Sequence, residues 1–269
     1  MLLIKSDPQT EAGDPPAQTF IDAIGAYNDE LTKAGTLVDA VGFQPSAKGA
    51  ILTLKDGERI LQKGPLGDPF KLNAGYWIIQ VSSRDEAIDW AKRVPFAASP
   101  SASEPGWTGE IEVRQIFDTD EFPVSEEESG WREQEEELRA QPPTRDPSLK
   151  RFFCTVNADA NSEAGVMPDE DGMAEMGAFI GEMASKGVFL SGDGLHPTSE
   201  GARVTYQKGV RSVTDGPFIE TKELFAGYAL LQAKSLDEAI EFGGRFLDVD
   251  VPLRGNTEGQ TVIREIFDA

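Results

Sequence analysis

A single histidine is the natural starting point for acid–base chemistry in this 269-residue chain. His196 is that residue, and an imidazole is the side chain whose ordinary pKa lies nearest neutrality. A nearby carboxylate would orient the ring and stabilise its charged form, and we expect Asp215, in the segment Thr-Asp-Gly-Pro, to supply it. The two residues therefore predict a His196–Asp215 pair that moves a proton on a small organic molecule.

Both residues also have plainer interpretations. A His that precedes Pro in a Gly-rich turn is often an exposed loop residue or a structural hydrogen-bond partner, and without a visible partner it is weak evidence for catalysis. Asp-Gly is turn chemistry, because the Asp carboxylate can accept a hydrogen bond from its own backbone two residues on. Cys154 follows Phe152 and Phe153 on an expected strand, where a buried and inert thiol is the usual outcome.

The composition limits the partners. The chain has 25 Lys and Arg against 47 Asp and Glu, and its net charge of −22 would repel phosphate backbones and anionic lipid headgroups. We therefore expect neither nucleic acid nor a membrane as partner. One His and one Cys do not supply the usual multi-His or multi-Cys metal sites, so we predict no metal and no cofactor. No stretch approaches the roughly 20 apolar residues of a membrane span, and a lone cysteine suits the reducing cytoplasm.

The two halves of the chain are copies of one unit. At a constant offset of 152 residues the turn residues Gly and Pro recur in the same order over nearly 80 positions. Such periodicity indicates a duplication, and Gly and Pro fix backbone geometry, so the fold is what has been kept. We predict a first unit at residues 1–118, an acidic linker at 119–148 and a second unit at 149–269.

Each copy predicts the same α+β fold. The order of elements is β-α-β-β-α-β with an added hairpin, which is the ferredoxin-like arrangement of an antiparallel sheet with two helices on one face. Asp56-Gly57 and Lys208-Gly209 suit tight hairpins, and the open sheet face needs a partner, which the other copy provides. The strands are expected at residues 2–5, 50–54, 75–81 and 111–117 in the first copy, and at 151–156, 203–206, 227–233 and 262–267 in the second.

The linker between the copies is strongly acidic. Residues 126–138 favour a helix without a wide apolar stripe, which indicates a solvated linker helix. Trp131 and Leu138 indicate that one narrow side of this helix still docks on the protein.

One long motif resembles a known family. Residues 213–223, followed by Ala226-Gly227-Tyr228, resemble the DGPF signature of the YCII-related proteins, and residues 192–199 resemble the segment that precedes it. The resemblance implies ferredoxin-like units that pair sheet to sheet, here as an intrachain pseudo-dimeric α+β barrel. It also implies a small cavity between sheet and loops, in which a His and an Asp act, but it implies no settled reaction.

The two copies differ where chemistry would lie. At the offset of 152, Gln44 stands in the place of His196 and Lys63 in the place of Asp215, so we expect the working site in the second copy. The predicted ligand-binding residues there are Arg203, Phe218, Glu220, Lys222, Glu223 and Tyr228. The chain is predicted to bind a small organic molecule, with acid–base turnover of lyase or isomerase type at His196. A non-catalytic ligand-sensing or protein-interaction module is the alternative, and assembly into a homo-oligomer stays open.

Residues common to both copies predict structural roles. Arg114 and Arg264 are expected to pair with carboxylates, and Tyr76 and Tyr228 to pack in the core or at its rim. The methionines at residues 173–183 follow helical spacing, so they are expected to fill the core.

Overall fold

The structure, a computed structural model, describes residues 1–122, 130–218 and 224–267. The first half contains β1 (Leu2–Lys5), α1 (Pro8–Ala12), α2 (Gln18–Lys33), β2 (Leu37–Gly42), β3 (Gly49–Lys55), β4 (Glu58–Lys63), β5 (Asn73–Ile79), α3 (Arg84–Lys92) and β6 (Gly109–Val113). The helix α4 (Gly130–Ala140) joins the halves. The second half contains β7 (Lys150–Asn157), α5 (Ala160–Glu163), α6 (Glu170–Ser185), β8 (Phe189–Gly194), β9 (Ala202–Gln207), β10 (Val210–Asp215), β11 (Phe225–Ala233), α7 (Leu236–Leu253) and β12 (Glu258–Glu265).

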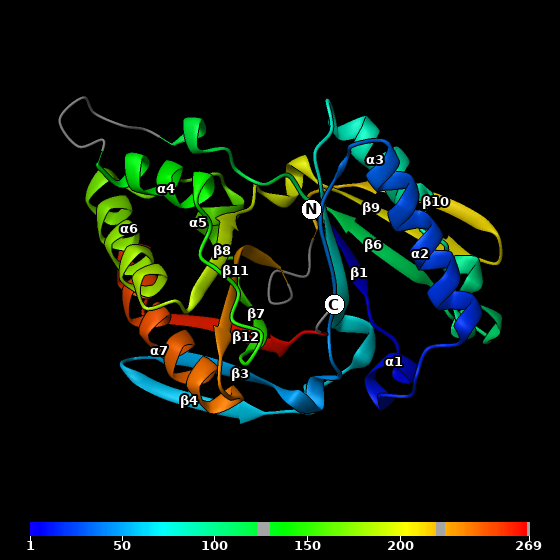
Figure 1. The fold of residues 1–269 in the computed structure, drawn as a ribbon, viewed down its shortest axis with the longest axis horizontal. Coiled ribbons are helices and arrows are strands. Elements are labelled where there is room, and N and C mark those ends of the chain that lie inside the picture. Colours follow the sequence, from blue (N-terminus) through cyan, green and yellow to red (C-terminus); the bar gives the residue numbers. More distant parts are fainter. Residues whose placement is uncertain (123–129, 219–223, 268–269) are drawn as a thin grey trace.

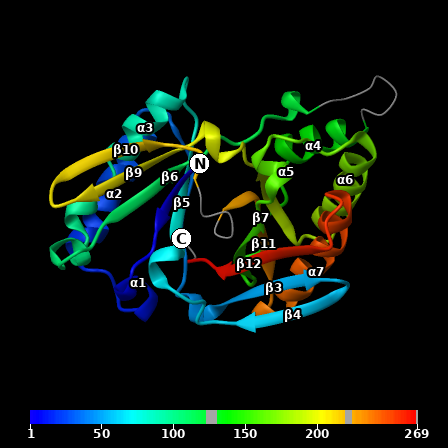
Figure 2. The same ribbon diagram turned by 180° about the vertical axis from the view of Figure 1, so that it is seen from behind.

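Two six-stranded antiparallel sheets form the framework, and each is built from both halves. Their strand orders are β10-β9-β6-β1-β5-β2 and β4-β3-β12-β7-β11-β8. The hairpin β9–β10 of the second half lies beside β6 of the first, and the hairpin β3–β4 of the first half lies beside β12 of the second (Figures 1 and 2). The added hairpins predicted for each copy are therefore exchanged between the copies.

The hairpin turns form as their residues predict. Asp56 and Gly57 have φ angles of 49° and 82°, and Lys208 and Gly209 have 48° and 86°. Two consecutive residues with positive φ define the turn that matches the twist of a two-residue hairpin, which explains the Gly at the second position. The predicted turns are confirmed.

The helix boundaries also follow local chemistry. Ser83 and Ser235 precede α3 and α7, and each hydroxyl accepts a hydrogen bond from the backbone N–H three residues on. Gly35 and Gly187 follow the ends of α2 and α6 with φ angles of 70° and 68°, the left-handed conformation that ends a helix.

Alternate residues along the strands serve two different layers. Leu2 and Trp77 pack under the helices of the first half, whereas Leu3 and Tyr76 lie between the two sheets. There Tyr76 meets Phe153 of the second half, with ring centroids 5.1 Å apart. The fold is thus α+β, with one helix-covered core in each half and a shared apolar layer where the sheets meet.

The helix α4 lies against α6, and its half-buried Leu138 faces inward, as predicted for one narrow side of the linker helix. The side chain of Trp131 is outside the described part of the structure, as are residues 126–129 of the predicted helix. Among the described residues no helix combines the length and the apolar character that a membrane span requires.

Candidate functional site

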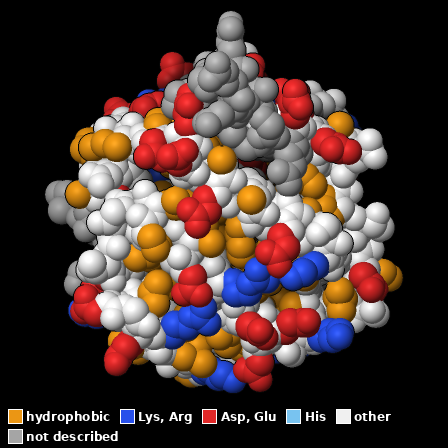
Figure 3. Space-filling view, turned by 90° about the vertical axis from the view of Figure 1, so that its left-hand side faces the viewer, with side chains coloured by type: hydrophobic (Ala, Val, Ile, Leu, Met, Phe, Trp, Pro, Cys, Tyr) orange, Lys and Arg blue, Asp and Glu red, His pale blue; other side chains and the backbone are white. Residues whose placement is uncertain are grey.

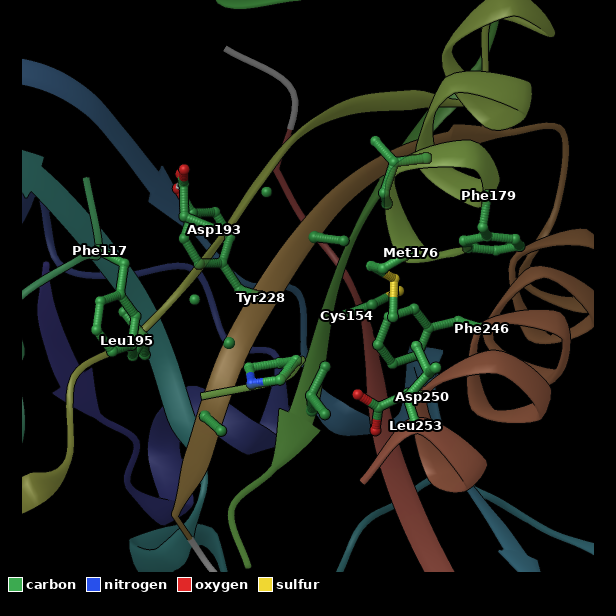
Figure 4. Close-up of a pocket in the computed structure, with 18 of the residues that line it drawn as sticks. Phe117, Cys154, Met176, Phe179, Asp193, Leu195, Tyr228, Phe246, Asp250 and Leu253 are labelled. Atoms are coloured by element: carbon green, nitrogen blue, oxygen red, sulfur yellow. Dashed lines mark hydrogen bonds between the residues drawn. The ribbon is translucent and has the colours of Figure 1, made fainter. Parts of the chain in front are cut away.

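A cavity of about 790 Å³ lies in the second half, between the sheet and the helices α6 and α7 (Figure 4). Its volume lies within the range of small-molecule sites, about 300–1,000 Å³. Most of its wall is apolar, with polar groups at the two ends. The side chains that form the apolar wall include Val156, Met176, Phe179, Ile180, Ala229, Leu231, Phe242, Phe246 and Leu253.

The cavity exists because the second half lacks a large side chain that fills the first. Trp77 on β5 is buried under α2 and packs edge-to-face with Tyr27, their centroids 5.6 Å apart. The equivalent residue on β11 is Ala229, a half-buried residue that lines the cavity. Leu2 is likewise replaced by Cys154, so two neighbouring strands present small side chains to the same space.

Charged groups gather at one end of the cavity. Asp250 of α7 is 7% exposed, and one of its carboxylate oxygens accepts a hydrogen bond from Nε of Arg254 at 2.8 Å. Asp159 lies 3.8 Å from the same guanidinium and accepts a hydrogen bond from Asn256 at 2.6 Å. Burial raises the pKa of Asp250, although Arg254 opposes the shift.

Asp159 shifts the other way. Burial disfavours its ionised form, but hydrogen bonds from the Ser162 N–H and from Asn256 outweigh burial and lower the pKa of Asp159. The charged end of the cavity therefore holds one carboxylate that readily ionises and one that resists ionisation.

Phe117, Leu195 and the pair Tyr228–Asp193 lie at the opposite end of the cavity (Figure 4). The hydroxyl of Tyr228 donates to Asp193 at 2.8 Å, and burial together with this carboxylate raises the pKa of Tyr228. Its ring packs on Phe153 with centroids 5.4 Å apart, so it belongs to the shared layer as well as to the cavity wall, in line with the predicted core or rim position.

His196 is buried outside the cavity wall. Its Nδ1 lies 3.0 Å from Glu200 and its Nε2 lies 3.2 Å from Glu121, while its ring stacks on Phe117 at 3.9 Å between centroids. Ionised carboxylates only accept hydrogen bonds and a neutral imidazole has one N–H, so both contacts are hydrogen bonds when the ring carries two protons. Phe117 separates this imidazole from the cavity, which it lines with its own ring.

The structure does not bring Asp215 to the histidine. Asp215 is exposed at the end of β10 and pairs with Arg84 of α3. Lys63, its equivalent in the first copy, pairs with Asp237 at 2.6 Å. Each copy thus uses this position for an ion pair to the other half, with the charges reversed. The exchange of Asp215 for Lys63 is matched by the exchange of Arg84 for Asp237 as the paired residue, so it does not indicate a catalytic carboxylate. The groups beside the ring are Glu121 and Glu200.

The DGPF segment anchors the exchanged hairpin. A Cβ at Gly216 would lie 1.7 Å from the carbonyl oxygen of Thr198, so the close backbone approach requires glycine. The N–H of Phe218 donates to the Thr198 hydroxyl at 3.2 Å, and the Arg203 guanidinium covers the Phe218 ring at 4.0 Å. Phe218 and Arg203 are absent from the wall of the cavity. The predicted ligand-binding residues Glu220, Lys222 and Glu223 lie outside the described residues.

Two buried arginines fasten the halves to each other. Arg264 of the second half donates to Glu11 at 2.9 Å and to the carbonyl oxygen of Gln44 at 2.8 Å. Arg114 of the first half bonds Glu112 at 3.0 Å and the carbonyl oxygen of His196 at 2.6 Å. The prediction that both pair with carboxylates is confirmed, and both hold loops of the opposite copy.

Cys154 is buried in the cavity wall, as its neighbours predicted. Burial raises the pKa of its thiol to about 12, so the side chain is an unreactive apolar group at neutral pH. Within residues 1–122, 130–218 and 224–267, no three His, Cys, Asp or Glu side chains are grouped as a metal site would need.

Sequence reasoning missed Ala229, Asp250 and Arg254. It compared polar residues between the copies, whereas the decisive difference is the apolar pair Trp77 and Ala229. Asp250 and Arg254 follow the part of the chain where the constant offset ends, so no counterpart in the first copy singled them out.

Fold and cavity together define a duplicated α+β protein whose two halves exchange hairpins and of which the second half is hollow. The sequence model of the YCII-related domain matches residues 1–119 and 151–246, so the chain belongs to the YCII-related family in two copies. The chain is also similar to an uncharacterised protein of Rhizobium meliloti (strain 1021), with 36% identity over 94 residues that make up 35% of this chain and 76% of the relative.

Proposed function

We propose that the protein binds a small organic molecule in the cavity of the second half. The observation that carries the proposal is the cavity of about 790 Å³ in the second half, where Ala229 takes the place of the buried Trp77 of the first copy. Packed interiors contain few voids larger than a water molecule, so a volume of this size is typical of a binding site.

The finer architecture belongs to the same proposal. The units at residues 1–118 and 149–269, joined by 119–148, pair as the pseudo-dimeric α+β barrel that the family resemblance implies. The shared layer, with Tyr76 against Phe153, supports this pairing. A cytoplasmic location accords with one cysteine that has no partner for a disulfide.

Acid–base turnover of lyase or isomerase type is the second candidate, and the proximity of His196 to the cavity favours it. Phe117 stacks on His196 and also lines the cavity, so proton transfer requires this ring to turn aside and bring the imidazole within hydrogen-bond reach of a ligand. In this version Glu121 and Glu200 orient the imidazole, the role predicted for Asp215. A non-catalytic ligand sensor needs no such approach and uses the cavity alone.

Fluorescence titration with N-phenyl-1-naphthylamine, a neutral apolar dye, tests the binding function. The wild type should bind the dye saturably, and Ala229→Trp should weaken binding because the indole takes part of the cavity, the space that Trp77 takes in the first copy. Gln44→Ala, at the first-copy position equivalent to His196, is the control and should bind like the wild type. Equal affinity of the Ala229→Trp variant and the wild type would overturn the proposal.

NMR of the His196 ring separates the two candidates. The chain has one His, so its ring resonances are free of overlap. A dye-dependent shift that Phe117→Ala enlarges would support contact between ring and ligand. If the chemical shifts of the His196 ring stay unchanged at a saturating dye concentration, the non-catalytic ligand sensor is the function that remains.

A further inference from the structure

The charged end of the cavity indicates which ligands it accepts. Two facts on that wall are independent of each other: the cavity itself, and a carboxylate on Asp250 that is 7% exposed and faces Arg254. Burial of a carboxylate is costly, and the carboxylate of Asp250 is held by Arg254, whose backbone N–H also donates to the Asp250 carbonyl oxygen at the end of α7. A charged group kept in such a position is the usual way to fix the polar part of a ligand.

The sign of the charge is set by the residues around Asp250. Among the described residues that line the cavity, Arg254 is the one basic side chain, against Asp159, Asp169 and Asp250, while Asp193 lies at the opposite end with Tyr228. Arg254 already faces Asp250 at 2.8 Å and Asp159 at 3.8 Å, so one guanidinium is shared by two carboxylates. A ligand carboxylate or phosphate would add a further negative charge to this end.

The equivalent region of the first copy contains different side chains. There Asp7, the equivalent of Asp159, accepts a hydrogen bond from the indole of Trp107 at 3.3 Å, and Ile111 occupies the place of Thr261. The second copy replaces these apolar groups with Asn256 and Arg254, which follow the C-terminal end of α7, and with the buried Thr261 of β12. Polar side chains therefore lie at this end of the cavity, where the first copy has the indole of Trp107.

We infer that the cavity takes an apolar molecule that carries an amine, with the hydrocarbon part along α6 and the ammonium group at Asp250. The inference rests on the proposed binding function and specifies its ligand. An ammonium group carries three N–H donors and no acceptor, which suits a wall of carboxylates and a hydroxyl. A cation beside Asp250 would also offset the burial that raises the pKa of this carboxyl.

The outer surface is compatible with a cationic ligand. Acidic side chains are spread across the face shown in Figure 3, with groups of basic side chains among them, and the chain as a whole has a net charge of −22. A field of this sign raises the local concentration of cations. It would also attract an amine without any specific site, so the experiment needs a control for net charge.

Three matched probes, 4-phenylbutylamine, 4-phenylbutanol and 4-phenylbutyrate, test the inference by calorimetric or NMR titration at pH 7. The amine should bind the wild type roughly tenfold more tightly than the alcohol, since charge-assisted hydrogen bonds are about twice as strong as neutral ones. The carboxylate should bind more weakly than either. This comparison uses the wild type and does not depend on a variant that folds.

Two substitutions locate the preference. Asp250→Asn should remove the advantage of the amine and leave the alcohol unchanged. Asp237→Asn removes an exposed carboxylate from the same helix, changes the net charge equally, and should keep the advantage. Equal affinities of amine and alcohol for the wild type, or equal effects of the two substitutions, would overturn the inference.

The variant Ala229→Trp distinguishes failure of the amine inference from failure of the proposed binding function. If that variant loses the alcohol but the amine has no advantage, the cavity is a binding site for another ligand class and the inference is wrong. If all three probes bind Ala229→Trp as they bind the wild type, the cavity is not their site and the proposed function fails with the inference.

Discussion

The pair of equivalent residues Trp77 and Ala229 allows the cavity to be tested without any ligand. Trp77 is 6% exposed, and its indole N–H donates to Asn28 at 2.8 Å. Trp77→Ala removes this side chain from a packed core, which typically costs about 3–5 kcal/mol of the free energy of unfolding. The first copy therefore supplies the reference value for a filled position.

Ala229→Trp should have a very different effect. In a packed core the larger side chain would cost about 1–3 kcal/mol or more. In the cavity of about 790 Å³ the indole buries on the order of 150 Å², worth about 4 kcal/mol at ~25 cal/mol per Å². Ordering the side chain costs about 1–1.5 kcal/mol, and an indole N–H without a partner costs about 1–2 kcal/mol. The free energy of unfolding of Ala229→Trp is thus expected to exceed that of the wild type by about 0–2 kcal/mol.

Urea denaturation with linear extrapolation measures both variants, provided that the m-value is unchanged. Ala239→Trp is the control, because Ala239 is fully buried on α7 and lies outside the cavity wall. It should destabilise the protein by the amount expected for overpacking. If Ala229→Trp destabilises as strongly as Ala239→Trp, the space beside Ala229 does not exist and the reasoning is refuted.

Four further outcomes follow from individual contacts. Burial raises the pKa of Asp250, so the folded protein holds this proton more tightly than the unfolded chain, and the stability it contributes is lost as the pH rises above the ordinary value of about 3.9. In denaturation at several pH values, the free energy of unfolding of Asp250→Asn should therefore rise relative to that of the wild type as the pH increases above about 4, and a constant difference would contradict this. Arg114→Met removes the buried ion pair to Glu112, which keeps Arg203 beside it, and the hydrogen bond to the His196 carbonyl, and it should cost about 3–5 kcal/mol in the same assay; a cost below about 1 kcal/mol would exclude a role in fastening the halves. His196→Gln should destabilise the protein in the same assay, because it removes a buried ring that stacks on Phe117 and contacts Glu121 and Glu200, and an unchanged free energy of unfolding would argue against these contacts. Lys63→Ala removes an exposed ion pair and should change the melting temperature little, with an effect of about 0–1 kcal/mol; a larger loss would show that the charge-reversed pair is essential.

The sequence was sufficient for every feature that depends on neighbouring residues. The turns at Asp56-Gly57 and Lys208-Gly209, the caps at Ser83 and Ser235 and the helix end at Gly35 all require particular residues at particular places. Such signals act within a few residues, so they can be read from one chain without knowledge of tertiary contacts.

The exchange of hairpins could not be predicted in the same way. A hairpin has the same turn and the same internal pairing whether its free edge meets the sheet of its own copy or that of the other. In retrospect the ion pairs Asp215–Arg84 and Lys63–Asp237 carry the information, since each joins the end of a hairpin to a helix of the opposite half. Their charges are reversed between the copies, so aligning the copies made the two positions look unrelated.

The sequence did not predict the neighbours of the histidine. His196 meets Glu121, which is 75 residues away in the chain and lies in the linker, where no repeat partner exists for comparison. The cavity was visible only as a missing aromatic ring at Ala229. A lost side chain leaves no motif, so a search for residues that do chemistry passes over it.

The exchange of hairpins also explains how the first copy, in which Trp77 takes the equivalent space, supports the second copy, which has the cavity. The core beneath α7 contains Leu52 and Leu54, which β3 of the first half contributes, packed against Leu247 and Val251. The helix that carries Asp250 is therefore held in place from outside the cavity by the other copy. A helix above an open volume has lost part of its own packing partners, and the exchanged hairpin supplies replacements on its far side. The first copy can thus lack a cavity of its own and still be required, because the geometry of the cavity in the second depends on its strands.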